Sequence, residues 1–163
     1  MKVAVLRAPT RKVGHFNDDL GLLIESMRAT MHAADGVGLA APQIGQSLKL
    51  AVIEYIPQPA DDGTEDSQPA IPFFAIVNPT ITQMNNDIEV YDEGCLSVPE
   101  LQTPVPRATE ISVLADNLAG ERVRIRAKGL LARILQHEID HLNGLMIVDR
   151  TIDKKVLKKY AKF

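Results

Sequence analysis

The stretch GLLARILQHEIDHLNG, residues 129–144, combines a helix pattern with a metal-binding pattern. A glycine stands at each end, and apolar residues recur between them at helical spacing: Leu130, Leu131, Ile134, Leu135, Ile139 and Leu142. On such a helix His137 and His141 are four positions apart, so they project from one face and can hold one metal ion. Glu138 stays near that ion without having to ligate it, which is where a base acting on an activated water belongs. The stretch therefore predicts metal-dependent hydrolysis.

Two histidines leave a metal ion short of protein ligands, so a third ligand must come from elsewhere in the chain. A downstream glutamate would complete a thermolysin-like site, but no glutamate follows Glu138. The pattern H-x-x-G-x-x-H is excluded as well, because Ile147 occupies its final position. The remaining histidines, His15 and His32, lie in a polar loop and in a predicted helix, and we expect them to be surface or hydrogen-bonded residues.

Cys95, within EGCLSVPE at 93–100, is the favoured third ligand. A thiolate, two imidazoles and one water form a known catalytic arrangement for Zn(II) and similar ions. A lone cysteine is commonly just a small buried apolar residue, but an HExxH helix in the same small chain favours the ligand interpretation. The rival chemistry is a nucleophilic Cys95–His137 pair. That alternative leaves His141 and Glu138 without a role.

The composition is that of an ordinary globular chain, and we expect a single catalytic domain over residues 1–163. Apolar residues make up 45% and charged residues 24% of the sequence. No apolar run is long enough to span a membrane, and the start, MKVAVLRAPTRK, lacks the apolar stretch of a signal peptide. The single cysteine excludes an internal disulfide, which suits a reducing cytosol. A net charge of −3 indicates no particular partner.

The residue patterns predict an α+β fold. Residues 18–34 are expected to form a helix that ends at Asp35-Gly36 and leads into a loop, GVGLAAPQIG. Strands are predicted at 48–56 and 73–79, separated by an exposed loop at 57–72 with four prolines. ISVLADN and ERVRIRA, on either side of a turn, predict a hairpin. Such an order indicates mixed or antiparallel sheets, here packed around the helix that carries HEIDH.

The last residues, 151–163, are expected to form a short basic C-terminal tail. They contain five lysines and one aspartate. A basic segment of this kind can contact nucleic acid or another anionic surface, although a solvated helix is the commoner outcome.

Three blocks occur together and in order: GVGLAAPQ at 36–43, EGCLS at 93–97 and QHEIDH at 136–141. This combination resembles the peptide deformylase family, which removes the formyl group from the N-terminal methionine of nascent bacterial and organellar proteins. The resemblance covers most of the chain. It implies N-formylmethionyl peptides as substrates. We further expect a monomer without membrane association and a weak contact with the ribosome. The resemblance also implies a bacterial-type cytoplasmic or an organelle-matrix location.

The resemblance also assigns the chemistry. It makes Cys95, His137 and His141 the metal ligands, and it makes Glu138 the catalytic acid and base. It implies one divalent metal ion, Fe(II) in the cell, for which Zn(II), Ni(II) or Co(II) can substitute.

The same resemblance implies the groups that contact the substrate. The Gln43 side chain and the Leu96 backbone N–H become the donors to the developing oxyanion. Val37 and Gly38 would line the methionine pocket, and Arg107 would lie near the site as a further substrate-binding residue.

The chemistry of the residues agrees with this assignment. A formamide is a poor electrophile, so a metal has to polarise its carbonyl and activate water near neutral pH. Fixed dipoles such as an amide side chain and a backbone N–H suit the oxyanion that forms. Asp140 is expected to support the site from behind, through Arg107, rather than to bind the metal. Two alternatives stay open: a deformylase-like binding protein with altered or lost turnover, and an amidase for another N-acyl group.

Overall fold

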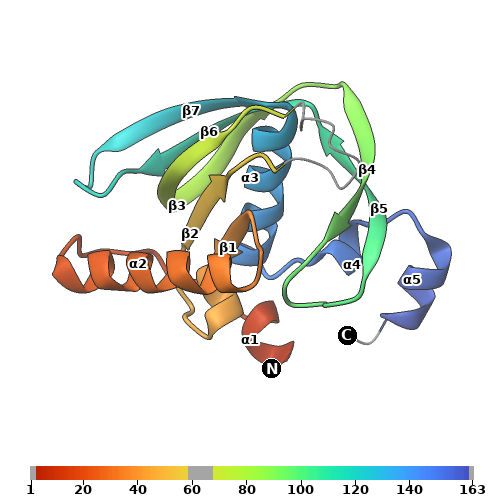
Figure 1. Ribbon diagram of the computed structural model, residues 1–163, viewed down its shortest axis with the longest axis horizontal. Helices are drawn as coiled ribbons and strands as arrows, with labels where there is room; N and C mark the ends of the chain where they lie inside the picture. Colours follow the sequence, from red (N-terminus) through yellow and green to blue (C-terminus); the bar gives the residue numbers. More distant parts are fainter. Residues whose placement is uncertain (1–2, 59–67, 162–163) are drawn as a thin grey trace.

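The computed structural model describes residues 3–58 and 68–161. It confirms the predicted α+β class, with two antiparallel sheets around one central helix (Figure 1). The larger sheet has five strands in the order β1-β2-β3-β6-β7, and the smaller sheet pairs β4 with β5. Their bounds are β1 Gly38–Ala40, β2 Leu50–Tyr55, β3 Ile71–Met84, β4 Ile88–Gly94, β5 Gln102–Ala108, β6 Glu110–Asp116 and β7 Arg122–Lys128.

The central helix is α3, Gly129–Leu142, which carries HEIDH and stands between the two sheets (Figure 1). Its apolar side packs against the five-stranded sheet, where Leu135 and Ile139 lie in a buried cluster with residues from β2, β3 and β6. The helix ends in a glycine turn, because Gly144 takes a φ of +75°, which favours glycine. A Cβ there would also lie 2.9 Å from the Arg7 carbonyl oxygen.

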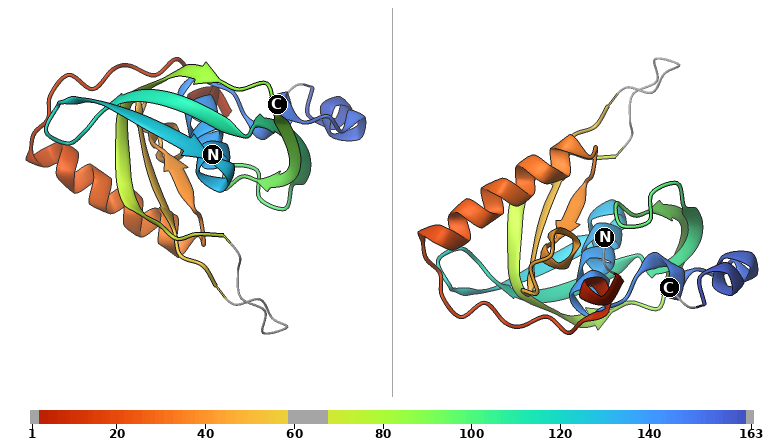
Figure 2. Two further views of the ribbon diagram at one scale, coloured as in Figure 1. Left: turned by 90° about the horizontal axis from the view of Figure 1, so that it is seen from above. Right: turned by 90° about the horizontal axis from the view of Figure 1, so that it is seen from below.

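The other face of the large sheet is covered by α2, Asp18–Ala33 (Figure 2). This is the predicted first helix, and the Asn17 side chain caps it by accepting a hydrogen bond from the Leu20 N–H. Its buried stripe is as the periodicity predicts: Leu20, Ile24, Met27 and Met31. The burial of this stripe against β2 and β3 closes a second apolar cluster.

Shorter helices complete the structure. They are α1 Val3–Arg7, the 3-10 helix η1 Ala41–Ile44, α4 Ile147–Arg150 and α5 Lys154–Lys159. The last of these lies in the expected short basic C-terminal tail, residues 151–163. In the described residues, no helix combines the length and apolar character needed to cross a membrane.

The predicted loop at 36–45 is wrong over most of its length. Gly38–Ala40 form β1, which pairs antiparallel with Ala51–Ile53, and Ala41–Ile44 form η1. The segment is short, small and rich in glycine and alanine, so its own sequence carries little strand signal; burial between α3 and α2 supplies the driving force. The expected loop at 57–72 also needs correction at its end, because β3 begins at Ile71, and its residues 59–67 lie outside the described residues.

The pairing of β4 with β5 does not follow from the sequence patterns. Pro104 and Pro106 stand in β5, opposite Asp92 and Val90. Proline argues against a central strand, but in a two-stranded sheet both strands are edges and can accept it. This small sheet matters for function because Cys95 follows directly after β4.

Candidate metal centre

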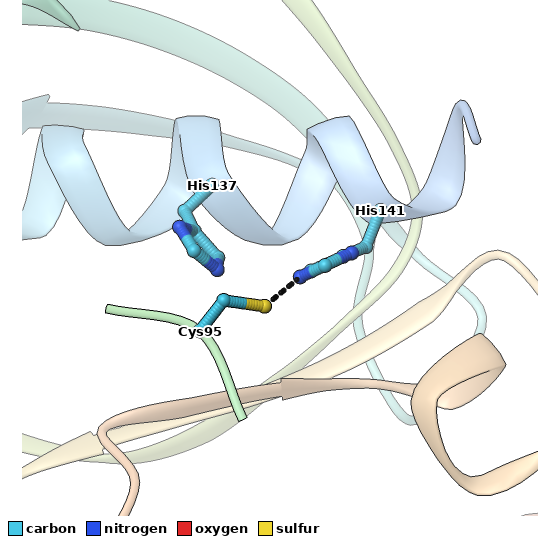
Figure 3. Close-up of side chains that lie close together, drawn as sticks. All are labelled: Cys95, His137 and His141. Carbon is cyan, nitrogen blue, oxygen red and sulfur yellow. Dashed lines mark hydrogen bonds between the residues drawn. The ribbon is translucent and has the colours of Figure 1, made fainter. Parts of the chain in front are cut away.

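The described residues bring one cysteine and two histidines together beside α3. One ligand atom each from Cys95, His137 and His141 can be chosen so that all three lie within 4.8 Å of one another. The Cys95 Sγ is 3.2 Å from the His141 Nε2 (Figure 3). The two imidazole rings are 4.9 Å apart between centroids and nearly perpendicular, and both point toward the sulfur (Figure 3). The one-face placement that the helical spacing predicts is thus present in the structure.

The donor set suits a single divalent cation. A sulfur and two imidazole nitrogens are the ligands that Zn(II) and neighbouring first-row metals accept in a tetrahedral catalytic site with one position open. The His137 Nδ1 binds the Glu93 Oε2 at 3.0 Å, which leaves the His137 Nε2 for the cluster, and the His141 Nε2 already lies beside the Cys95 Sγ. The residues present therefore fit a metal ion.

Electrostatics favour one positive charge in the cluster. Burial alone would lower the pKa of His137, but hydrogen bonds with Cys95 and Glu93 raise this pKa to about 10. Burial, with the charge of His137 as the second cause, lowers the pKa of His141 to about 3. Two rings this close do not both take a proton. The preference for a single positive charge among the three donors agrees with a site for a cation.

Glu138 lies beside the cluster and is 3% exposed. Burial raises the pKa of its carboxyl to about 7, which suits a group that takes and returns a proton near neutrality. Its Oε1 lies against the backbone of β1, because a Cβ at Gly38 would come within 2.3 Å of that oxygen. Its Oε2 has no hydrogen-bond partner among the described residues. A buried carboxylate oxygen without a partner is expected where substrate or water is to be met.

Gln43 reaches the cluster from η1 with a fixed orientation. Its Oε1 accepts a hydrogen bond from the Ala40 N–H at 2.8 Å. The amide nitrogen is therefore turned toward the site, where it donates to the Ser97 Oγ at 3.1 Å and lies 3.9 Å from the Cys95 Sγ. Leu96, the residue after the cysteine, lines the same space. The structure thus places Gln43 and Leu96, the two residues predicted to supply the oxyanion donors, along the same cavity.

A cavity of about 850 Å³ opens over these groups. It lies between the loop before β1, the segment after β4, and one face of α3. Val37, Gly38 and Leu96 contribute to its walls, and Leu130 and Ile134 of α3 form an apolar side. The cavity is large enough for several residues of an extended peptide.

Arg107, predicted to contact the substrate, does not line this cavity. It is buried behind the cluster, where its Nε and Nη2 donate to the two oxygens of Glu93 at 2.9 Å each. Its Nη1 donates to the Asp140 Oδ2 at 2.5 Å. Asp140 also accepts from Arg150 at 2.6 and 3.0 Å. Asp140 and Arg107 are therefore joined as expected, but in a supporting layer.

Glu93 is the functional residue that sequence reasoning missed. Its carboxylate, buried on β4, binds His137, Arg107 and Arg133 together. These charged partners lower its pKa to about 2 against the opposing effect of burial. A usable signal exists in the sequence: Glu93 stands two positions before Cys95, and a ligating histidine normally needs an acceptor for its second nitrogen.

His15 and His32 do not join the cluster. The His32 Nε2 lies 2.7 Å from the Glu54 Oε2, and the side chains of His32 and His15 are exposed. Both placements agree with the expectation that neither histidine binds the metal.

Comparison with known proteins gives one consistent result. The family model described as "Polypeptide deformylase" matches residues 1–157. A peptide deformylase of Roseiflexus castenholzii is 47% identical over 148 residues, covering 89% of this chain and 80% of that protein. One from Dictyoglomus turgidum is 39% identical over 153 residues, covering 94% and 90%.

Solved structures agree with the relatives. A peptide deformylase from Synechococcus elongatus in complex with actinonin is similar with a TM-score of 0.83 and 38% identity, over 95% of this chain and 78% of that chain. Peptide deformylase from Thermotoga maritima is similar with a TM-score of 0.79 and 38% identity, over 91% and 92%.

Proposed function

The chain belongs to the peptide deformylase family, and we propose how its own residues carry out the reaction of that family. The enzyme removes the N-formyl group from formylated peptides by metal-dependent hydrolysis. We assign Cys95, His137 and His141 as the metal ligands. The observation that carries this assignment is their convergence within 4.8 Å beside a buried glutamate and an open cavity.

The metal would contribute chemistry that the side chains lack. A divalent cation held by these ligands supplies a Lewis acid that polarises the formyl carbonyl and makes a water molecule acidic enough to attack near neutral pH. We propose Fe(II) as the cation in the cell. The same thiolate and imidazole donors suit Zn(II), Ni(II) and Co(II), so these ions should substitute.

Glu138 is proposed to move the proton. Its carboxylate takes a proton from the attacking water, so that an oxygen–carbon bond forms at the formyl group. It then delivers that proton to the peptide nitrogen as the carbon–nitrogen bond breaks. The products are formate and a free N-terminal amine. The raised pKa of this carboxyl supports both halves of the transfer.

Gln43 and Leu96 are proposed to hold the charge that develops on the former carbonyl oxygen. The Gln43 Nε2 is already oriented by the Ala40 N–H, so its dipole needs no rearrangement as the charge appears. The backbone N–H of Leu96 would act as the second donor. Ser97, which now accepts from Gln43, would give up that hydrogen bond to the substrate.

Val37 and Gly38 are proposed to bind the substrate. Gly38 would let the substrate backbone approach β1 closely, because glycine has no side chain to block it. The apolar wall from α3 and Val37 would take the methionine side chain, whose flexible thioether fits irregular apolar space. Arg107 has no access to this cavity, and we assign it a supporting role through Glu93 and Asp140.

We also propose a partner other than the peptide substrate, the ribosome. Lysines of α5, Lys154, Lys155, Lys158 and Lys159, are exposed and would provide a weak, salt-sensitive contact with the ribosome. We propose that the enzyme works as a monomer in the compartment where formylated chains are made.

The ligand assignment is tested by metal content and formate release together. Wild-type protein prepared with Fe(II) without oxygen should bind one metal ion per chain and release formate from a formyl-Met peptide. Cys95→Ser should lose both properties, because a hydroxyl is a much poorer ligand than a thiolate for these ions. A Cys95→Ser variant that holds metal as tightly as wild type would refute the assignment.

A further inference from the structure

Arg133 stands on α3 four residues before His137 and holds an unusually dense set of contacts. Its Nη1 donates to the Glu93 Oε1 at 3.0 Å and to the Val105 carbonyl at 3.2 Å. Its Nη2 donates to the Glu89 carbonyl at 3.1 Å. The guanidinium carbon also lies 4.7 Å from the centre of the Tyr91 ring. One side chain of α3 thus donates hydrogen bonds to both strands of the small sheet.

These contacts meet the metal cluster at Glu93. Its Oε2 is shared by the His137 Nδ1 and the Arg107 Nη2, and its Oε1 is shared by the Arg107 Nε and the Arg133 Nη1. Arg107 comes from β5, the partner strand of β4, so its forked pair with Glu93 lies within the small sheet. Arg133 and His137 instead come from neighbouring turns of α3. The carboxylate, which stands on the strand that leads to Cys95, is therefore held both from β5 and from the helix that carries the other two candidate ligands.

We propose that Arg133 is a positioning residue for the metal ligand His137, and that it acts through Glu93. The inference rests on the ligand assignment made under the proposed function. A carboxylate that binds the second nitrogen of a ligating histidine fixes the orientation of its ring. Arg133 in turn holds the Oε1 of that carboxylate from the cavity wall, whereas Arg107, which donates to the same oxygen, does not line the cavity.

The same side chain also contributes to the cavity wall. Arg133 lines the cavity together with Leu130 and Ile134, although its side chain is only 15% exposed. The charged head is occupied by Glu93, by the two strand carbonyls and by Tyr91. The aliphatic stem is the part that an arginine in this position offers to an apolar pocket. Substitutions of Arg133 can therefore separate the contribution of the guanidinium from that of the aliphatic stem.

Arg133→Met keeps an unbranched apolar stem and removes the guanidinium. Arg28→Met is the matched control, because Arg28 also binds both oxygens of a glutamate, Glu54, and stacks 4.3 Å from the Phe73 ring, away from the cavity. We expect Arg133→Met to release Zn(II) to a chelator about tenfold faster than wild type, at the lower end of the effect of outer-shell substitutions. Arg28→Met should release it at the wild-type rate.

Kinetics and spectroscopy supply independent readouts. In the Co(II) form, Arg133→Met should alter the visible absorption bands, because the orientation of His137 changes, while its far-ultraviolet circular dichroism stays that of wild type. For a formyl-Met peptide, kcat should fall with KM within about twofold of wild type, since the stem of the pocket wall remains. Arg133→Ala removes the stem as well and should also raise KM.

A double-mutant cycle with Glu93→Gln decides whether the path runs through Glu93. We expect Arg133→Met to accelerate Zn(II) release when it is the only substitution. In a protein that already carries Glu93→Gln, it should have little further effect on the release rate. Full additivity of the two substitutions, or a wild-type release rate in Arg133→Met, would overturn the inference. Failure of the wild-type protein itself to bind Zn(II) would instead refute the ligand assignment on which it rests.

Discussion

Glu138 of α3 lies directly against the backbone of Gly38 in β1, and no β-carbon fits between them. An ideal Cβ at position 38 would come within 2.3 Å of the Glu138 Oε1 and 2.8 Å of its carboxyl carbon. The glycine therefore does more than let a substrate approach. It creates the space in which the buried carboxylate stands beside the metal cluster.

Gly38→Ala is expected to lower kcat/KM for a formyl-Met peptide by about a hundredfold, because a misplaced catalytic group commonly costs that much. The methyl group would push the Glu138 carboxylate out of its position. The three atoms nearest to the added Cβ all belong to Glu138 and not to a metal ligand, so metal content should stay that of wild type. Gly14→Ala is the control, because a Cβ there meets nothing within 4 Å. Wild-type kinetics in Gly38→Ala would show that the position of Glu138 is not critical.

Gln43→Ala tests the oxyanion donor. Removing the amide should lower kcat by about 10²–10³, the usual cost of deleting one such donor. KM and metal content should change little, because Gln43 reaches the cluster only through a 3.9 Å contact with sulfur. Ser97→Ala, which removes only the present acceptor of that amide, should keep most of the activity. A loss of metal in Gln43→Ala, with kcat per bound metal unchanged, would remove Gln43 from the oxyanion site.

The helix and the cluster could be predicted because their signals are local in sequence. HEIDH lies on one helix, and the absence of any glutamate or histidine downstream of it directs attention to Cys95. The α2 stripe and the β6–β7 hairpin follow from helical and alternating periodicity in the same way. Each of these features needs only a few neighbouring residues to be recognised.

The remaining parts depend on contacts between distant segments. β1 is three residues long and is stabilised by its place between α3 and α2, and β5 contains two prolines that argue against a strand. Glu93, which supports His137, lies 44 positions from His137 and 40 positions from Arg133 in the chain. Periodicity carries no information about such pairs.

Asn78 provides a stability test away from the site. It is buried with a φ of +51°, its Oδ1 accepts from the Val13 N–H at 2.8 Å, and its Nδ2 donates to Val13 and Asp116. Asn78→Ala should lower the free energy of unfolding by about 2–4 kcal/mol, because it leaves a buried N–H without its partner and puts alanine at a strained φ. Chemical denaturation measures this loss. A loss below about 0.5 kcal/mol, the range of ordinary surface substitutions, would contradict it.

Glu54 gives a pH dependence with a definite sign. Hydrogen bonds from Arg28 are the largest cause that lowers the pKa of this carboxyl from its ordinary value of 4.5. Its contribution to stability is therefore present above that value and is lost as the pH falls through the lower folded-state pKa. Glu54→Gln should lower Tm by about 2–4 °C at pH 7, as expected for a loss of about 1 kcal/mol in a partly exposed pair. The difference from wild type should close toward pH 3, and a gap that widens on acidification would contradict the assignment.

The central claim is that Glu138 moves the proton in a site whose metal is held by Cys95, His137 and His141. The most direct test is formate release per bound metal by wild type and Glu138→Gln, both loaded with Fe(II) without oxygen. We expect the variant to keep its metal and to lose activity by a factor of about 10²–10⁴, the range for removal of a general acid–base group. A Glu138→Gln enzyme that releases formate at the wild-type rate per metal would contradict the claim.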